Sequence, residues 1–75
     1  MVKLPNVNSK KLIIVLQSFG FALDYSTGSH FIFRNPETGK RATIPYHNKD
    51  LPKGTVISIL KEAGISKEDF KNFLI

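Results

Sequence analysis

Cysteine is absent from this chain of 75 residues. The protein therefore has no disulfide, no thiolate zinc ligand and no thiol nucleophile, so its stability depends on packing and on any partner it binds. Long apolar runs are also missing: no segment approaches the roughly 20 apolar residues of a membrane span, and residues 1–5 do not resemble a signal peptide. We expect a soluble cytoplasmic protein with no membrane partner.

Acidic residues are scarce, with six Asp and Glu against eleven Lys and Arg and a net charge of +5. This excess favours a polyanionic partner, nucleic acid first, over the alternative of a solvated basic surface. Hydrophobic residues make up 41% and charged residues 23% of the chain, which indicates one globular domain over residues 1–75 with a modest core. We expect the six phenylalanines to form most of that core rather than a base-stacking platform.

Apolar residues at helical spacing predict three helices. Asn8 or Ser9 caps the first helix, which ends at Gly20. The second helix ends at Gly64, and Ser66 caps a short third helix. The apolar stripes of the three helices consist of Leu12, Ile13, Leu16 and Phe19, then Val56, Ile59, Leu60 and Ala63, then Phe70, Phe73 and Leu74.

Period-two alternation between the first two helices predicts three antiparallel strands, the first of them half-buried. The second strand has Phe31 and Phe33 on one face and His30, Ile32 and Arg34 on the other, and the pattern leaves open which face is buried. We expect an α+β fold in which helices cover one face of a three-stranded antiparallel sheet, in the order α-β-β-β-α with a short C-terminal helix. The expected segments are strands at 21–26, 30–34 and 40–44 (ended by Pro45), a turn at Thr27 and Gly28, and loops over 35–39 and 46–52.

The tripeptide Gly28-Ser29-His30 brings a histidine to the start of the second strand. Imidazole acts as an acid, a base or a phosphate partner near neutral pH. The ordinary alternative is a partly buried histidine whose ring nitrogens bond to neighbouring groups. RNA carries its own nucleophile, the 2′-hydroxyl, so one histidine with a nearby Lys or Arg suffices for slow RNA cleavage without a metal.

His47 is the only other histidine in the chain. It is a candidate for a second proton-transfer group or a phosphate contact, although an exposed loop histidine is the simpler interpretation. The two histidines with Asp24 or Asp50 match no metal-ligand spacing, and the chain has no glycine-rich nucleotide loop. We expect no metal and no cofactor.

Lys53-Gly54-Thr55 opens the second helix, where free backbone N–H groups, the positive end of the dipole and a lysine favour phosphate. The alternative is that Thr55 or a neighbour caps the helix. Arg34 and Arg41 are further candidates for contacts to the RNA backbone. Lys10 and Lys11 fall in the first turn of the first helix, where cations are locally unfavourable, which is a weak indication of an anionic partner.

An ordered set of short motifs spans nearly the whole chain: Leu4-Pro5, Leu16 through Gly20-Phe21, Gly28-Ser29-His30 leading into Phe33-Arg34, Thr43-Ile44-Pro45, Lys53-Gly54-Thr55, Ile59-Leu60 and Ala63-Gly64-Ile65-Ser66. In this set the chain resembles the HicA-like toxins, mRNA interferases whose fold is similar to the double-stranded RNA-binding domain. The resemblance implies that His30 is catalytic, that Gly28 and Ser29 shape its turn, and that a HicB-like antitoxin covers the site. The resemblance also implies a second polar or aromatic residue after that histidine, often another histidine. This chain has Phe31 there, which leaves the role of His30 intact and argues against a paired-histidine mechanism at the turn.

A double-stranded RNA-binding module without catalysis is the alternative function. The lysine-rich signature expected at the last helix of such a module is missing, since only Lys53 and Lys61 are present there. The sequence therefore favours a metal-independent endoribonuclease that cleaves mRNA and blocks translation.

Overall fold

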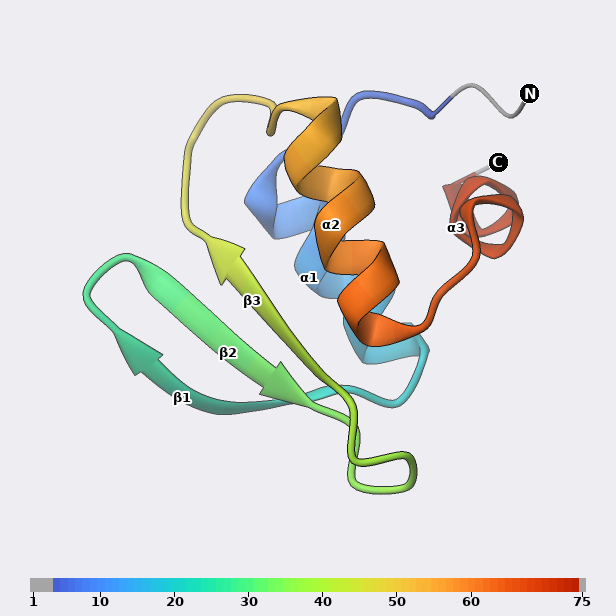
Figure 1. The fold of residues 1–75 in the computed structure, drawn as a ribbon. Helices are drawn as coiled ribbons and strands as arrows, with labels where there is room; N and C mark the ends of the chain where they lie inside the picture. The colour runs from blue at the N-terminus through green and yellow to red at the C-terminus, as the bar shows by residue number, and fades with distance from the viewer. Residues whose placement is uncertain (1–3, 75) are drawn as a thin grey trace.

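The computed structural model describes residues 4–74, which form a three-stranded sheet and three helices (Figure 1). The strands make one antiparallel sheet in the order β1-β2-β3. Figure 1 shows α1 and α2 together on one side of this sheet, with α3 beyond them. The expected α+β architecture is thus confirmed. The elements are α1 (Ser9–Ser18), β1 (Ala22–Thr27), β2 (His30–Arg34), β3 (Arg41–Pro45), α2 (Lys53–Ala63) and α3 (Lys67–Leu74).

The helix ends follow the capping residues in the sequence. Asn8 is the N-cap of α1, and its side-chain Oδ1 accepts a hydrogen bond from the Lys11 backbone N–H at 2.8 Å. Gly64 ends α2 with a φ of 74°, a left-handed conformation that glycine adopts without steric cost. The Ser66 hydroxyl accepts from the N–H of Asp69, in the first turn of α3, at 3.0 Å. Local chemistry therefore sets where each helix begins or ends.

The core lies between the helices and one face of β2 and β3. Phe33 on β2 and Ala42 and Ile44 on β3 are buried against the helices, and Phe31 packs at the edge of this cluster. The other face of β2, with His30, is the one left open. Buried residues of the helices and loops complete the core: Leu4, Val7, Leu12, Val15, Leu16, Phe21, Leu51, Val56, Ile59, Leu60, Ala63, Ile65 and Phe70.

The prediction that the first strand is half-buried is wrong, because all six residues of β1 are exposed. The pairing of β1 with β2 shifts register between Leu23 and Tyr25, so a bulge at Asp24 breaks the alternation. Leu23 pairs with core-facing Phe33 and is 54% exposed, whereas Tyr25 pairs with Ile32 of the open face and is 49% exposed. The packing of α1 and α2 is against β3, so β1 extends past the helices without cover (Figure 1).

Smaller corrections concern the strand and helix starts. The turn occupies Gly28 and Ser29 instead of residues 27 and 28, and β3 begins at Arg41 and includes Pro45. The interpretation that Thr55 or a neighbour caps α2 is wrong: the N-cap is Pro52, which makes no side-chain cap hydrogen bond. None of the helices in residues 4–74 is long and apolar enough to cross a membrane.

Candidate active site

The β1–β2 hairpin turns through only two residues, Gly28 and Ser29, and Thr27 and His30 pair across it. Gly28 has a φ of 56°. In the described chain only glycines have a positive φ, so Ser29, the second turn residue, has a negative one. A glycine at the first of two turn positions is typical of a II′ hairpin turn, whose twist matches that of the strands. Gly28 and Ser29 therefore do shape the turn that presents His30.

His30 is the first residue of β2 and is exposed. Phe31 and Phe33, which share one face of β2, point to the helices. Because side chains alternate along a strand, the imidazole of His30 lies on the other, open face with Ile32 and Arg34. The grouping of these five residues into two faces was predicted correctly. The alternative of a partly buried, structurally bonded histidine is wrong, since His30 is exposed and its ring has no hydrogen-bond partner within residues 4–74.

The end of β3 is joined directly to the hairpin that carries His30. Pro45 is the cross-strand partner of His30, and the Tyr46 backbone N–H donates to the Ser29 carbonyl at 2.7 Å. The Tyr46 ring meets Phe31 edge-on, with ring centroids 5.4 Å apart and an interplanar angle of 85°. These contacts join the hairpin tip to the segment that leads to His47.

A fully buried serine holds this region to α1. The Ser9 hydroxyl donates to the Pro45 carbonyl at 2.6 Å and accepts from the His47 backbone N–H at 2.9 Å. The sequence pattern indicated Ser9 only as a helix cap. Because Asn8 takes the capping role, the Ser9 hydroxyl is available for the bond to β3. The sequence signal for such a contact was the presence of two adjacent residues able to cap α1, Asn8 and Ser9, because only one of them is needed as the cap.

The two histidines consequently lie at the same end of the sheet. Pro45 pairs with His30, and His47 follows two residues later, so the Cα atoms of the two histidines are within about 13 Å of each other. Both side chains are exposed.

Arg34 and Arg41 lie opposite each other at the other end of β2 and β3. Arg34 is four positions after His30 on β2, which corresponds to about 13 Å along the strand. Arg34 also lines a shallow hollow of about 170 Å³ with Asp24 and Pro36 among its neighbours. The structure thus places the two arginines together, on the same face as His30 and apart from it.

The start of α2 is open, but its lysine is engaged. Lys53 Nζ donates to the Leu4 carbonyl at 2.9 Å, which ties the N-terminal segment to the helix. Gly54 is exposed, with no atom within 4 Å of where a Cβ would stand, and Thr55 is half-buried. The first turn of α2 contains no acidic residue and no side-chain cap, so its backbone N–H groups remain available to an anion.

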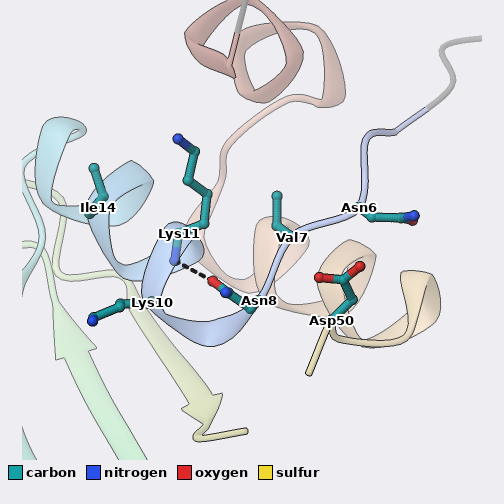
Figure 2. Close-up of a pocket in the computed structure, with 7 residues that line it drawn as sticks. All are labelled: Asn6, Val7, Asn8, Lys10, Lys11, Ile14 and Asp50. Atoms are coloured by element: carbon teal, nitrogen blue, oxygen red, sulfur yellow. Dashed lines mark hydrogen bonds between the residues drawn. The ribbon is translucent and has the colours of Figure 1, made fainter. Parts of the chain in front are cut away.

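A second hollow, of about 370 Å³, lies at the start of α1 (Figure 2). Lys10 and Lys11 leave the helix here in different directions, and Asp50 borders the far side of the hollow. Asn8 is paired to Asp50 through a backbone bridge, which joins this hollow to the loop that follows β3. Over residues 4–74, no three His, Cys, Asp or Glu side chains gather as a metal site would require.

The sequence region that builds this site matches a known family. A family model described as the HicA toxin of bacterial toxin-antitoxin matches residues 9–65. The match includes β1, β2, β3, α2 and all of α1, and with them both histidines and both arginines of the sheet. A comparison with curated proteins found no match.

Proposed function

The chain belongs to the HicA toxin family, so it is the toxin of a toxin–antitoxin pair, and from this premise we propose that it is a metal-independent endoribonuclease that cleaves mRNA. The observation that carries the proposal is the exposed His30 directly after a two-residue turn, at the end of the sheet that is followed by His47. Cleavage of mRNA blocks translation. Because mRNA is translated in the cytoplasm, the proposed cleavage takes place there.

The chemistry uses the substrate's own 2′-hydroxyl. As the bond from O2′ to phosphorus forms, a base accepts the hydroxyl proton; as the bond from phosphorus to O5′ breaks, an acid supplies a proton to the leaving oxygen. His30 performs one of these transfers, and His47 is the candidate for the other. Acid–base catalysis of this kind contributes typically 10²- to 10⁴-fold, which suits a slow toxin.

Cations and backbone N–H groups hold the RNA backbone in this proposal. The start of α2, with Lys53, Gly54 and Thr55, lies after the loop that carries His47 and offers N–H groups to a phosphate. Arg34 and Arg41 provide positive charge on the face that carries His30. No metal ligand is needed for either contact, so cleavage should persist in EDTA.

Regulation is proposed to come from a HicB-like antitoxin that covers the His30 end of the sheet. The net charge of +5 suits an acidic antitoxin surface as well as RNA. Antitoxin and RNA should therefore compete for this protein. Binding of both at full affinity in the same complex would contradict that part of the proposal.

Induced expression in cells, with total mRNA as the readout, tests the nuclease proposal. The wild type should arrest growth and deplete mRNA, and His30→Ala should do neither while remaining folded by circular dichroism. Thr27→Ala, at the cross-strand partner of His30, is the matched control and should keep the toxicity. An RNA-binding module without catalysis would instead show the same effects for wild type and His30→Ala.

A further inference from the structure

The open face of the sheet carries its side chains in three cross-strand rows. Residues paired across antiparallel strands lie on the same face, and successive rows on one face are two residues, or about 7 Å, apart. A histidine belongs to the first row, an aromatic residue to the middle row and two arginines to the last row. The rows are Thr27, His30 and Pro45; then Tyr25, Ile32 and Thr43; then Ala22, Arg34 and Arg41.

Tyr25 is the aromatic residue of the middle row, and 49% of its surface is exposed. Its partner Ile32 is only 7% exposed although it lies outside the core beneath the helices, which indicates that side chains of the open face cover it. The aromatic contacts found within residues 4–74 pair Phe19 with Phe73 and Phe31 with Tyr46. The Tyr25 ring thus has no aromatic partner in the described chain and is accessible to a planar ligand.

The last row concentrates positive charge. Arg34 and Arg41 are directly opposite each other, an arrangement that is unfavourable for two like charges unless an anion lies between them. Asp24 lines a hollow with Arg34, so this row of two arginines has one carboxylate nearby and keeps a positive charge. A phosphate group would balance that excess and accept hydrogen bonds from both guanidinium groups.

We propose that this open face binds an unpaired stretch of RNA. One base stacks on Tyr25, one row away from His30, and Arg34 and Arg41, two rows away from His30, hold the RNA backbone. The proposal rests on the proposed function, and it specifies the substrate as single-stranded. A base can stack on a side chain only when its own partner strand is absent, and such stacking tolerates any base. Tyr25 is then a specificity residue that selects unpaired RNA.

Charge complementarity favours RNA over a protein at this face. The row of two arginines and the row of His30 flank the aromatic ring on either side, as alternating phosphates and bases require. The exposed leucine of β1, Leu23, pairs with Phe33 and lies on the opposite face from Tyr25, although it borders the hollow beside Arg34. Leu23 therefore offers a matched control on the same strand with similar exposure.

The experiment measures RNA binding in the His30→Ala protein, in which the RNA stays intact. The probes are a fluorescent single-stranded oligonucleotide and the same sequence in a duplex. Adding Tyr25→Ala should weaken binding of the single strand about 5- to 150-fold, the loss expected for one stacked base. Tyr25→Phe keeps the ring and should bind within about twofold of the parent, and Leu23→Ala should match the parent.

Three results would overturn the inference. One is equal binding of the single strand with and without the Tyr25 ring. Another is an equal loss for Leu23→Ala and Tyr25→Ala, which would show a general effect on β1. The third is loss of antitoxin binding, without loss of RNA binding, on Tyr25→Ala, which would make this face a protein interface. Failure of the His30→Ala protein to bind either RNA would contradict the nuclease proposal itself as well.

Discussion

The Ser9 hydroxyl, at the start of α1, donates a hydrogen bond of 2.6 Å to the carbonyl of Pro45, at the end of β3. The same oxygen accepts from the backbone N–H of His47 at 2.9 Å. One fully buried side chain thus connects the first helix, the strand paired with His30 and the loop of the second histidine. This contact therefore joins α1 to the backbone segments beside the two histidines.

Replacing Ser9 with alanine should destabilise the protein by about 1–3 kcal/mol, because the Pro45 carbonyl and the His47 N–H both lose their hydrogen-bond partner. In a domain of this size each kcal/mol lowers Tm by about 4–8 °C, so a thermal melt detects the change. Ser18→Ala is the matched control, since the Ser18 hydroxyl bonds only to the Val15 carbonyl within its own helix. Equal melting temperatures for the two variants would contradict the role assigned to Ser9.

Asn35 should be the most sensitive position of the β2–β3 loop. Its side chain is buried; Nδ2 donates to the Phe19 carbonyl at 3.2 Å, and Oδ1 accepts from the N–H groups of Glu37 and Thr38. Asn35→Ala should cost about 1–3 kcal/mol in urea denaturation. Asn35→Asp retains the acceptor and loses the donor, so it separates the two roles. Asn72→Ala, at an exposed position of α3, should be neutral.

Gly28 should tolerate only residues that accept a positive φ. Its φ is 56° and no atom lies within 4 Å of where a Cβ would stand, so a side chain there has a conformational cost and meets no steric obstacle. We expect Gly28→Ala to cost about 1–2 kcal/mol of stability and Gly28→Asn less, because asparagine enters this region more readily. Chemical denaturation measures both. A larger loss for Asn than for Ala would contradict this account of the turn.

Arg34→Gln and Arg41→Gln should each reduce the salt dependence of RNA binding. Every phosphate contact to single-stranded nucleic acid contributes about 0.7 to the slope of log K against log salt concentration. Each substitution should therefore lower the slope by about 0.7 for every phosphate that the arginine neutralises. Binding titrations at several salt concentrations give the slope. Lys61→Gln, on the exposed side of α2, is the control and should leave the slope unchanged.

Much of the fold could be predicted from local residue chemistry. The caps at Asn8 and Ser66, the stop at Gly64 and the two faces of β2 all depend on neighbours within a few residues, and all are as expected. The prediction for β1 failed because burial depends on where the helices pack. Alternation in the sequence shows that two faces differ, but it does not show whether anything covers either face.

The candidate site divides in the same way. The turn that presents His30 follows from Gly28 and could be predicted. The hydrogen bonds of Ser9 with Pro45 and His47 span more than 35 residues, and no local pattern contains them. Lys53 was expected to face a phosphate, and the structure shows its ammonium group bonded to the Leu4 carbonyl.

The sequence by itself determined the helices, the glycine of the β1–β2 turn and the residue that begins β2, because capping, glycine conformation and side-chain periodicity act over a few residues. The tertiary structure decided which face of the sheet stays open, which strand lies beyond the helices, and which polar groups meet at the end of β3. These features depend on packing between segments far apart in the chain. Periodicity carries no information about such packing.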